Sequence, residues 1–159
     1  MNMENTCYVD TVDADLFGLG GWCAWKHPSS KTFYAVRSIR KPDGSWTQQR
    51  LHQVIAQRMG IVGAPDHKDR NGLNNRRNNL RQATSSQNVA NQSLRSNNTS
   101  GYKGVSWDKA SGKWVAKVKV NGKQQQHLGL FSDPIEAAKT YDRAALKAFG
   151  DFAFLNFPN

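Results

Sequence analysis

The spacing of hydrophobic and polar positions is clearest in the last third of the chain. Over residues 113–120 apolar side chains alternate with mainly lysines, which predicts a strand with one buried face. Asn121-Gly122 is a two-residue hairpin turn. Asp133-Pro134 predicts the start of a helix, which Gly150 ends. We therefore expect a three-stranded antiparallel sheet packed on one helix. The strands are expected at residues 102–107, 113–120 and 123–130.

The first half of the chain has shorter patterns. Residues 7–50 predict short strands with a hairpin turn at Lys41–Gly44. Residues 48–59 carry apolar side chains at helical spacing and predict a helix, in which we interpret His52 as structural. A short strand is expected to end at Asp66-His67. We expect a second strand at residues 80–83, followed by a helix that starts near Ser86 and is capped by Thr84 or Ser85. Strand, loop, strand and helix in this order predict a ββα unit.

These elements predict an α+β fold in two domains. We expect a small β-rich N-terminal unit plus the ββα unit at residues 1–92, a polar linker at 93–100, and the sheet-and-helix domain at 101–159. No apolar run is long enough to span a membrane, and the N-terminus lacks the pattern of a signal peptide. Cys7 and Cys23 form no CxxC pair, so we expect neither a zinc ribbon nor a disulfide framework. This cysteine content is typical of a protein in the reducing cytoplasm.

The net charge of +10 is distributed unevenly along the chain. Residues 1–66 carry a net charge of +1, residues 67–98 carry +5 and residues 99–159 carry +4. Positive charge in such an asymmetric distribution is typical of a polyanion-binding protein. The resemblances described below imply that this polyanion is double-stranded DNA.

The candidate chemistry centres on Asp66-His67, with Asn79 12 residues after the histidine and Asn88 22 residues after the aspartate. A neutral His67 can take a proton from an attacking water. Asp66 and the side-chain oxygen of Asn88 are hard ligands for one Mg²⁺ or Mn²⁺ ion. Asn79 is expected to hold the loop after His67 and to fix the imidazole tautomer; the alternative is a turn residue without a catalytic contact. Arginines expected to hold phosphates nearby are Arg76, Arg77 and Arg81.

Around these residues the sequence resembles the zinc-free, phage-type HNH homing endonucleases. The resemblance rests on Asp66-His67, Asn74–Arg77, Asn79–Arg81 and Gln87-Asn88. It implies that His67 is the general base, that Asp66 and Asn88 hold one divalent ion, and that Asn79 is the middle asparagine. Arg70 stands where this family often has glycine, which predicts a changed loop conformation.

The last 60 residues resemble the Apetala/ethylene-response-factor type of DNA-binding domain. The resemblance rests on 101–105, 112–118, 127–131, 136–138, 141–142 and 155–158. It implies that the sheet lies in the major groove. The positions that match the family's DNA contacts are Lys103, Ser106, Lys119, Gln125 and His127, and we also expect Lys113 and Lys117 to bind DNA. Lysine lacks the planar guanidinium group with which arginine pairs with guanine. Contacts to phosphates, rather than to bases, are therefore expected to dominate DNA binding by this domain.

The two resemblances together predict a phage-encoded HNH endonuclease of a mobile element, acting in the bacterial host cell. We expect a monomer or a weak dimer on DNA, with one such site per chain. A monomer is expected to nick, and a double-strand break requires dimerisation or two events. Two alternatives remain open. One is a DNA-binding regulator with an inactive nuclease domain, and the other is a non-specific or structure-selective phage nuclease.

Overall fold

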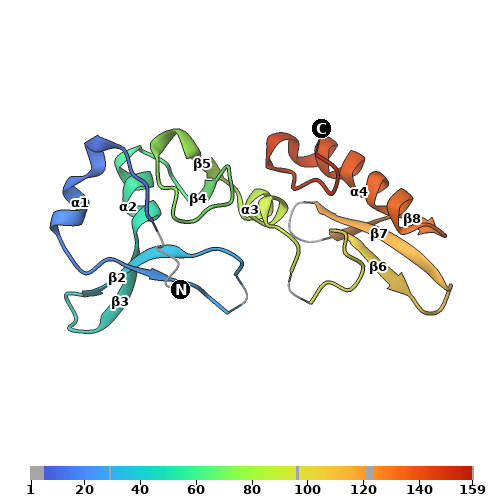
Figure 1. The fold of residues 1–159 in the computed structure, drawn as a ribbon, viewed down its shortest axis with the longest axis horizontal. Coiled ribbons are helices and arrows are strands. Elements are labelled where there is room, and N and C mark those ends of the chain that lie inside the picture. The colour runs from blue at the N-terminus through green and yellow to red at the C-terminus, as the bar shows by residue number, and fades with distance from the viewer. Residues whose placement is uncertain (1–5, 29, 96, 121–123, 159) are drawn as a thin grey trace. The chain divides into compact units, whose positions relative to one another are not determined.

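The chain folds into two compact units, Met1–Ala83 (unit 1) and Thr84–Asn159 (unit 2) (Figure 1). The computed structural model describes residues 6–28, 30–95, 97–120 and 124–158. Each unit combines short strands with helices, in agreement with the predicted α+β class. The division falls directly after residue 83, whereas the sequence analysis placed the end of the first domain at residue 92.

A three-stranded antiparallel sheet in unit 1 contains the predicted hairpin. Its strands are β1 (Cys23–Trp25), β2 (Tyr34–Arg40) and β3 (Trp46–Arg50), in the order β1-β2-β3. Gly44 allows the tight turn after Arg40 because its φ is 83°, a value that L side chains rarely adopt. The predicted helix is shorter than expected: α2 spans Leu51–Arg58. Residues 48–50 pair with β2 instead, which delays the start of the helix.

The N-terminal segment of unit 1 is partly helical, which the sequence analysis did not predict. A 3₁₀ turn (Thr11–Asp13) and the short helix α1 (Asp15–Gly18) precede β1. Leu16 from α1 packs into the core, so this segment covers one side of it. The buried core residues of unit 1 are Leu16, Ala35, Leu51, Ile55, Leu73 and Leu80.

The second hairpin of unit 1 consists of the two strands that the sequence analysis placed on either side of the polar loop. β4 (Ala64–His67) pairs antiparallel with β5 (Leu80–Ala83), with Asp66 opposite Arg81 and His67 opposite Leu80. His67 therefore lies at the end of a strand, as predicted. The intervening loop contains a 3₁₀ turn at Arg77–Asn79.

Helix α3 (Ser85–Asn91) begins unit 2 with the predicted cap. The hydroxyl of Thr84 accepts a hydrogen bond from the backbone N–H of Gln87, and the side chain of Gln87 accepts one from the backbone of Thr84. This capping box satisfies two backbone donors that a helix leaves unpaired. Within unit 2, the N–H of Phe154 donates to the carbonyl of Ala90, which ties α3 to the C-terminal tail.

The rest of unit 2 is the predicted sheet on one helix. The strands β6 (Val105–Asp108), β7 (Lys113–Val120) and β8 (Gln124–Phe131) form an antiparallel sheet in that order. Helix α4 (Pro134–Phe149) packs on one face, and Asp133 caps it by accepting from the N–H of Ile135. The predicted turn at Asn121-Gly122 lies outside the described residues. The buried residues between sheet and helix are Val105, Ala116, Val118, Ala137, Ala138, Tyr141 and Ala145.

The polar segment predicted as a linker at residues 93–100 belongs to unit 2. The side-chain amide of Asn98 donates to the carbonyl of Tyr102, and the hydroxyl of Ser100 donates to that of Val105. Such side-chain-to-backbone hydrogen bonds fold a polar stretch that has no apolar periodicity. Among the helices that the structure describes, none has the length and apolar character needed to cross a membrane.

Candidate active site and nucleic-acid interface

Asp66 lies buried at the end of β4 and is paired with an arginine from the neighbouring strand. The Nε of Arg81 donates to Oδ2 of Asp66 at 2.9 Å, and the side chains are 15% and 9% exposed. The register that places Asp66 opposite Arg81 brings the two groups together. Arg81 was expected to hold a phosphate; in the structure it contacts the predicted metal ligand instead. The contact fixes the orientation of the Asp66 carboxylate.

His67, the predicted general base, is buried and its ring orientation is set by Asn75. The Nε2 of His67 lies 3.1 Å from Oδ1 of Asn75. The Nδ2 of Asn75 donates to Sγ of Cys7 and to the carbonyl of Leu73, which identifies Oδ1 as the acceptor. A neutral His67 must therefore carry its proton on Nε2 and its lone pair on Nδ1. Burial lowers the pKa of His67, and this effect outweighs the hydrogen bond to Asn75, which raises it.

Two further rings lie against His67. The ring of His52 from α2 packs edge-on, with 5.0 Å between ring centroids, and the ring of Tyr34 from β2 is 6.1 Å away. His52 is buried, and its Nδ1 has no hydrogen-bond partner within the described part of the chain. Burial, the charge of His67 and that of Arg50 lower the pKa of His52 to about 3. His52 is thus a neutral packing residue, consistent with its interpretation as structural.

Asn79 holds the loop that follows His67. Its Oδ1 accepts from the N–H of Asp69 at 3.1 Å, and its Nδ2 donates to Oδ1 of Asp69 and to the carbonyl of Asn74. This agrees with the predicted loop contact. The predicted control of the His67 tautomer is performed by Asn75, so that part of the prediction is wrong. A catalytic role for Asn79 stays a prediction. Asn75 could have been suspected from its place in the Asn74–Arg77 motif, but the motif gives it no role.

Asp69 and Arg70 shape the same loop. Burial raises the pKa of Asp69, but hydrogen bonds from the Asn74 amide, the Asn71 N–H and the Asn79 amide outweigh that effect and lower it. Arg70 has a φ of 65°, in the left-handed region that favours glycine. Arg70 therefore adopts a backbone conformation that glycine takes up without strain.

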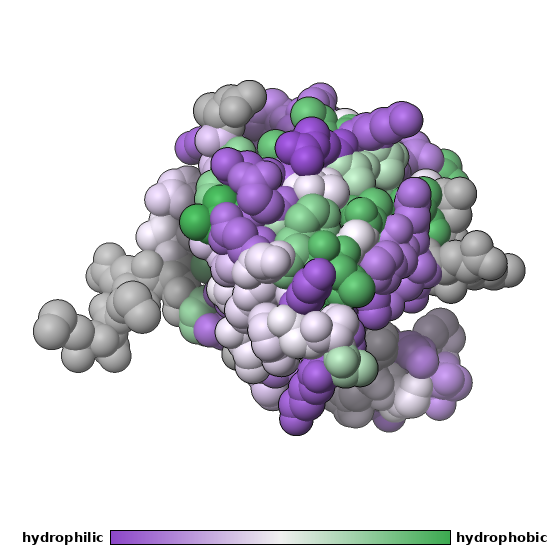
Figure 2. All heavy atoms as spheres, turned by 90° about the vertical axis from the view of Figure 1, so that its right-hand side faces the viewer, coloured by the Kyte–Doolittle hydropathy of each residue, from purple (hydrophilic) through white to green (hydrophobic). Residues whose placement is uncertain are grey.

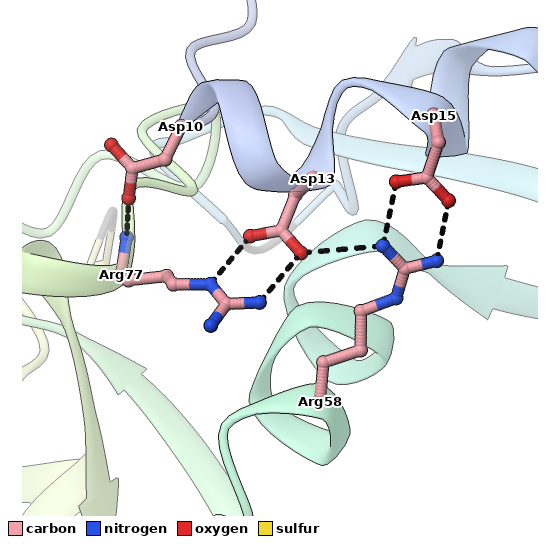
Figure 3. Close-up of polar contacts among 5 residues, drawn as sticks. All are labelled: Asp10, Asp13, Asp15, Arg58 and Arg77. Atoms are coloured by element: carbon pink, nitrogen blue, oxygen red, sulfur yellow. Dashed lines mark hydrogen bonds and ion pairs between the residues drawn. The ribbon is translucent and has the colours of Figure 1, made fainter.

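Arg77 is bound inside unit 1 rather than presented to a phosphate (Figure 3). Its guanidinium contacts the fully buried carboxylate of Asp13 at 2.8 and 3.0 Å, and its backbone N–H donates to Asp10. Arg58 approaches Asp13 from α2 and forms two hydrogen bonds of 2.7 Å with Asp15. The phosphate contact predicted for Arg77 is therefore corrected to a structural ion pair that fixes the N-terminal segment.

The remaining residues of the predicted centre are placed as follows. Arg76 is exposed, with its guanidinium 5.1 Å from the ring centroid of Tyr8. Asn88 lies half-buried on α3 and belongs to unit 2. The joint metal site of Asp66 and Asn88 stays a prediction. Among the described residues, no three His, Cys, Asp or Glu side chains form a group that could hold a metal ion.

Six of the seven predicted DNA contacts in unit 2 share one face of the sheet. Lysines 113, 117 and 119 alternate along β7 with the residues that face α4. Pairing places Ser106 beside Val115, His127 beside Lys117 and Gln125 beside Lys119, on the outer face. Figure 2 looks onto unit 2 and shows polar side chains around a smaller group of apolar ones. Leu130, opposite Val115 on this face, is 44% exposed.

Lys103 is the seventh predicted contact, and the structure uses it differently. Its Nζ donates to the carbonyls of Val89, Ala90 and Gln92 at the C-terminus of α3. An ammonium group has three donors, and a cation at a helix C-terminus is favourable. Lys103 is therefore a helix-capping residue here, and we correct its assignment as a ready phosphate contact.

The comparison with known proteins identifies the second unit. Residues 100–151 match the AP2 domain model, within the strands and the helix just described. The chain is 48% identical over 59 residues to an ethylene-responsive transcription factor of Arabidopsis thaliana. It is 42% identical over 60 residues to APETALA2-like protein 2 of Oryza sativa. The matches cover 36% and 37% of this chain, and the chain spans 32% and 14% of those plant proteins. Residues 100–151 are an AP2 DNA-binding domain.

A phage protein matches a larger share of its own length. The chain is 38% identical over 88 residues to protein 3.8 of Escherichia phage T7, a match that covers 55% of this chain and 71% of the phage protein. The chain belongs to the protein 3.8 family. Unlike the plant proteins, this relative resembles the chain over most of its own length. The match to protein 3.8 covers about half of this chain, and the AP2 domain covers residues 100–151.

Proposed function

We propose that this protein is a metal-dependent DNA endonuclease of the HNH type, which docks on double-stranded DNA through its AP2 sheet. The observation that carries the proposal is the buried contact of His67 Nε2 with Asn75 Oδ1 beside Asp66. It leaves the lone pair of a neutral imidazole on Nδ1, the form that a general base needs.

The donor set fits a hard divalent cation. A carboxylate from Asp66 and an amide oxygen from Asn88 are the ligand types that Mg²⁺ or Mn²⁺ prefers, and two protein ligands leave positions for water and phosphate. When bound, the ion would neutralise charge on the phosphate and on the leaving oxygen. Arg81 orients the Asp66 carboxylate by donating from Nε to its Oδ2. Asn79 holds the loop in place. His67 Nδ1 takes the proton of the attacking water.

The AP2 sheet supplies the docking surface. Lysines 113, 117 and 119 lie on its outer face and contribute three of the positive charges of unit 2. Neutralising phosphates with lysine releases counterions, so affinity should fall steeply as salt rises. This surface holds the protein on DNA while the centre around His67 performs the hydrolysis.

A second candidate is a DNA-binding regulator with an inactive nuclease unit. It is favoured by the pairing of Arg77 with Asp13 and of Arg81 with Asp66, because both arginines had been expected on phosphates. The match to an ethylene-responsive transcription factor agrees with this candidate. A non-specific or structure-selective nuclease differs from the first proposal only in its substrate.

Cleavage of supercoiled plasmid distinguishes these candidates. The purified chain with Mg²⁺ should convert supercoiled DNA to nicked circles, and both chelator and His67→Ala should abolish the conversion. His127→Ala removes a histidine from the AP2 sheet and should reduce binding while leaving the cut rate at saturating protein unchanged. DNA binding without any nicking would favour the regulator. Mapping the cut ends would separate a site-preferring enzyme from a non-specific one.

A further inference from the structure

The start of the chain runs beside the loop that carries Asn75. Tyr8 and Asn74 form an isolated parallel β-bridge. The N–H of Tyr8 donates to the carbonyl of Leu73, and the carbonyl of Tyr8 accepts from the N–H of Asn75, each at 2.8 Å. A segment more than 60 residues away in the sequence therefore holds the backbone of this loop. We call residues 7–13 the N-terminal arm.

The N-terminal arm also contributes to the orientation of the Asn75 amide. Nδ2 of Asn75 donates to Sγ of Cys7 and to the carbonyl of Leu73, each at 3.2 Å. The arm holds the second acceptor as well, because the N–H of Tyr8 donates to the same carbonyl. A reversed amide would turn its oxygen toward that carbonyl and leave the NH₂ group facing His67. Both acceptors therefore favour the observed orientation.

The orientation of this amide determines which nitrogen of His67 holds the proton. Oδ1 of Asn75 lies 3.1 Å from Nε2 of His67, and a carbonyl oxygen can only accept a hydrogen bond. The hydrogen bond that one ring nitrogen makes sets the tautomer, and with it the state of the other nitrogen. The arm thus acts on His67 through one intermediate, since Cys7 and Tyr8 hold Asn75 and Asn75 holds the imidazole.

Two aspartates attach the other end of the arm to the same loop (Figure 3). Oδ2 of Asp10 accepts from the backbone N–H of Arg77 at 2.7 Å. The fully buried carboxylate of Asp13 accepts from the Arg77 guanidinium at 2.8 and 3.0 Å. Hydrogen bonds from Arg77 lower the pKa of Asp13 and outweigh the opposing effect of burial. Because Arg77 lies two residues after Asn75, these contacts also restrain the backbone of Asn75.

Asp15 offers an internal comparison on the same segment. It carries the same charge as Asp10, but its partner is Arg58 of α2, which it contacts through two hydrogen bonds of 2.7 Å. Asp15 therefore joins the segment to a helix, whereas Asp10 joins it to the loop. Loss of the Asp15 carboxylate should weaken the attachment of the segment without moving the amide of Asn75.

We propose that Cys7 and Asp10 are positioning residues of the His67 centre, so that the N-terminal arm supports the catalytic chemistry. The proposal rests on the proposed function in taking His67 as the general base. Cys7 acts on the amide of Asn75 and Asp10 acts on the backbone of the loop, while neither touches the reacting atoms. Together they keep the proton on Nε2 and leave the Nδ1 lone pair for the attacking water.

The first readout is the tautomer of His67 in the full-length chain. Two-bond nitrogen–proton correlation spectra at neutral pH distinguish the two nitrogens of a neutral imidazole. Comparison with His67→Ala assigns the His67 signals among the four histidines. The parent is compared with Cys7→Ala, which removes the acceptor, and with Cys7→Ser, which keeps one. Cys23→Ala is the matched control, because it removes the other cysteine of the chain.

The second readout is the rate of plasmid nicking with Mg²⁺, measured at saturating protein and separately from the protein concentration that gives half of that rate. The variants of Cys7 are joined by Asp10→Ala, by Asp10→Asn, which keeps one acceptor oxygen, and by the control Asp15→Ala. Tautomer spectra are recorded for these variants too. Thermal unfolding of each protein checks that it remains folded.

We expect the parent, both conservative variants and both controls to show only the Nε2–H tautomer and similar rates. Cys7→Ala and Asp10→Ala should show an additional Nδ1–H population. Their saturated nicking rates should fall roughly tenfold, as for a lost outer-shell partner, while the half-saturating concentration stays within about twofold. The rate falls because the orientation of the ring is lost together with the tautomer.

A parental tautomer and rate in both Cys7→Ala and Asp10→Ala would overturn the proposal. An equal loss in Asp15→Ala or Cys23→Ala would overturn it as well, because that result shows a general loss of stability. Failure of the nuclease proposal appears separately, as plasmid left intact by the parent. The tautomer spectra test the role of the arm in that case too, because they do not depend on cleavage.

Discussion

The Nε2 of His67 lies 3.1 Å from Oδ1 of Asn75, a buried contact between the end of β4 and the loop that follows it. Asn75 is fully buried, and its amide group is held by Cys7 and Leu73. The position of the acceptor is therefore fixed before DNA arrives. This arrangement selects one imidazole tautomer and gives Asn75 a role that the sequence motif alone did not reveal.

Removing that acceptor should impair chemistry and spare binding. Asn75→Ala should lower the rate of plasmid nicking at saturating protein by roughly 100-fold, within the range of a lost general-base contribution. Affinity for a 30-base-pair duplex should stay within twofold of the parent. Asn78→Ala, an exposed asparagine in the same loop, is the matched control and should retain the parental rate. Equal nicking by the two variants would remove Asn75 from the mechanism.

The two assignments for Lys103 can be separated by salt dependence. Lys119→Met should lower the slope of log affinity against log salt by about 1, because one phosphate contact is lost. Lys103→Met should leave that slope unchanged and speed amide hydrogen exchange at residues 89–92, where the ammonium caps α3. A drop in slope equal to that of Lys119→Met would restore Lys103 as a DNA contact.

Gly104 should tolerate no side chain. Its φ is 75°, and an added Cβ would lie 1.9 Å from Cδ2 of the Tyr141 ring. Gly104→Ala should therefore destabilise unit 2 by about 2–4 kcal/mol through backbone strain and overpacking. Gly112 has a similar φ of 62° but no neighbour within 4 Å of an added Cβ, so Gly112→Ala should cost only about 1 kcal/mol. Denaturant unfolding of both variants, monitored by hydrogen exchange in α4, measures the difference.

The stability of unit 1 should depend on the protonation of His52. Burial, followed by His67 and Arg50, lowers its pKa from 6.5 to about 3. Between these values the unfolded chain binds the proton and the folded chain does not, so the free energy of unfolding rises with pH. The contribution is complete above pH 6.5 and is lost toward pH 3, with a slope of at most about 1.4 kcal/mol per pH unit.

His52→Phe keeps a ring at this position and removes the titration. The difference in unfolding free energy between parent and variant should therefore change across pH 3–6.5 and stay constant above it. Urea unfolding at several pH values gives both curves. A difference that does not change with pH would show that His52 is protonated equally in the folded and unfolded states.

The sequence by itself determined the local elements whose signals lie within a few residues. Alternation along residues 113–120 predicted β7, and the Thr84 and Asp133 caps predicted the starts of α3 and α4. The face shared by the lysines of β7 followed from the same alternation. Each of these features depends on a neighbouring residue or a short period, so no distant contact was needed to predict it.

Only the tertiary structure decided which charged groups contact each other. The sequence predicted Arg77 as a phosphate ligand. In the structure, the N-terminal segment, more than 60 residues earlier in the chain, places Asp13 against the Arg77 guanidinium. The sequence predicted that Lys103 contacts DNA. In the structure, the Lys103 ammonium instead donates to carbonyl groups at the C-terminal end of α3. Residues 48–50 continued a helical pattern, but pairing with β2 made them a strand. A buried carboxylate or an unpaired carbonyl takes the nearest cation, and only the fold determines which cation is nearest.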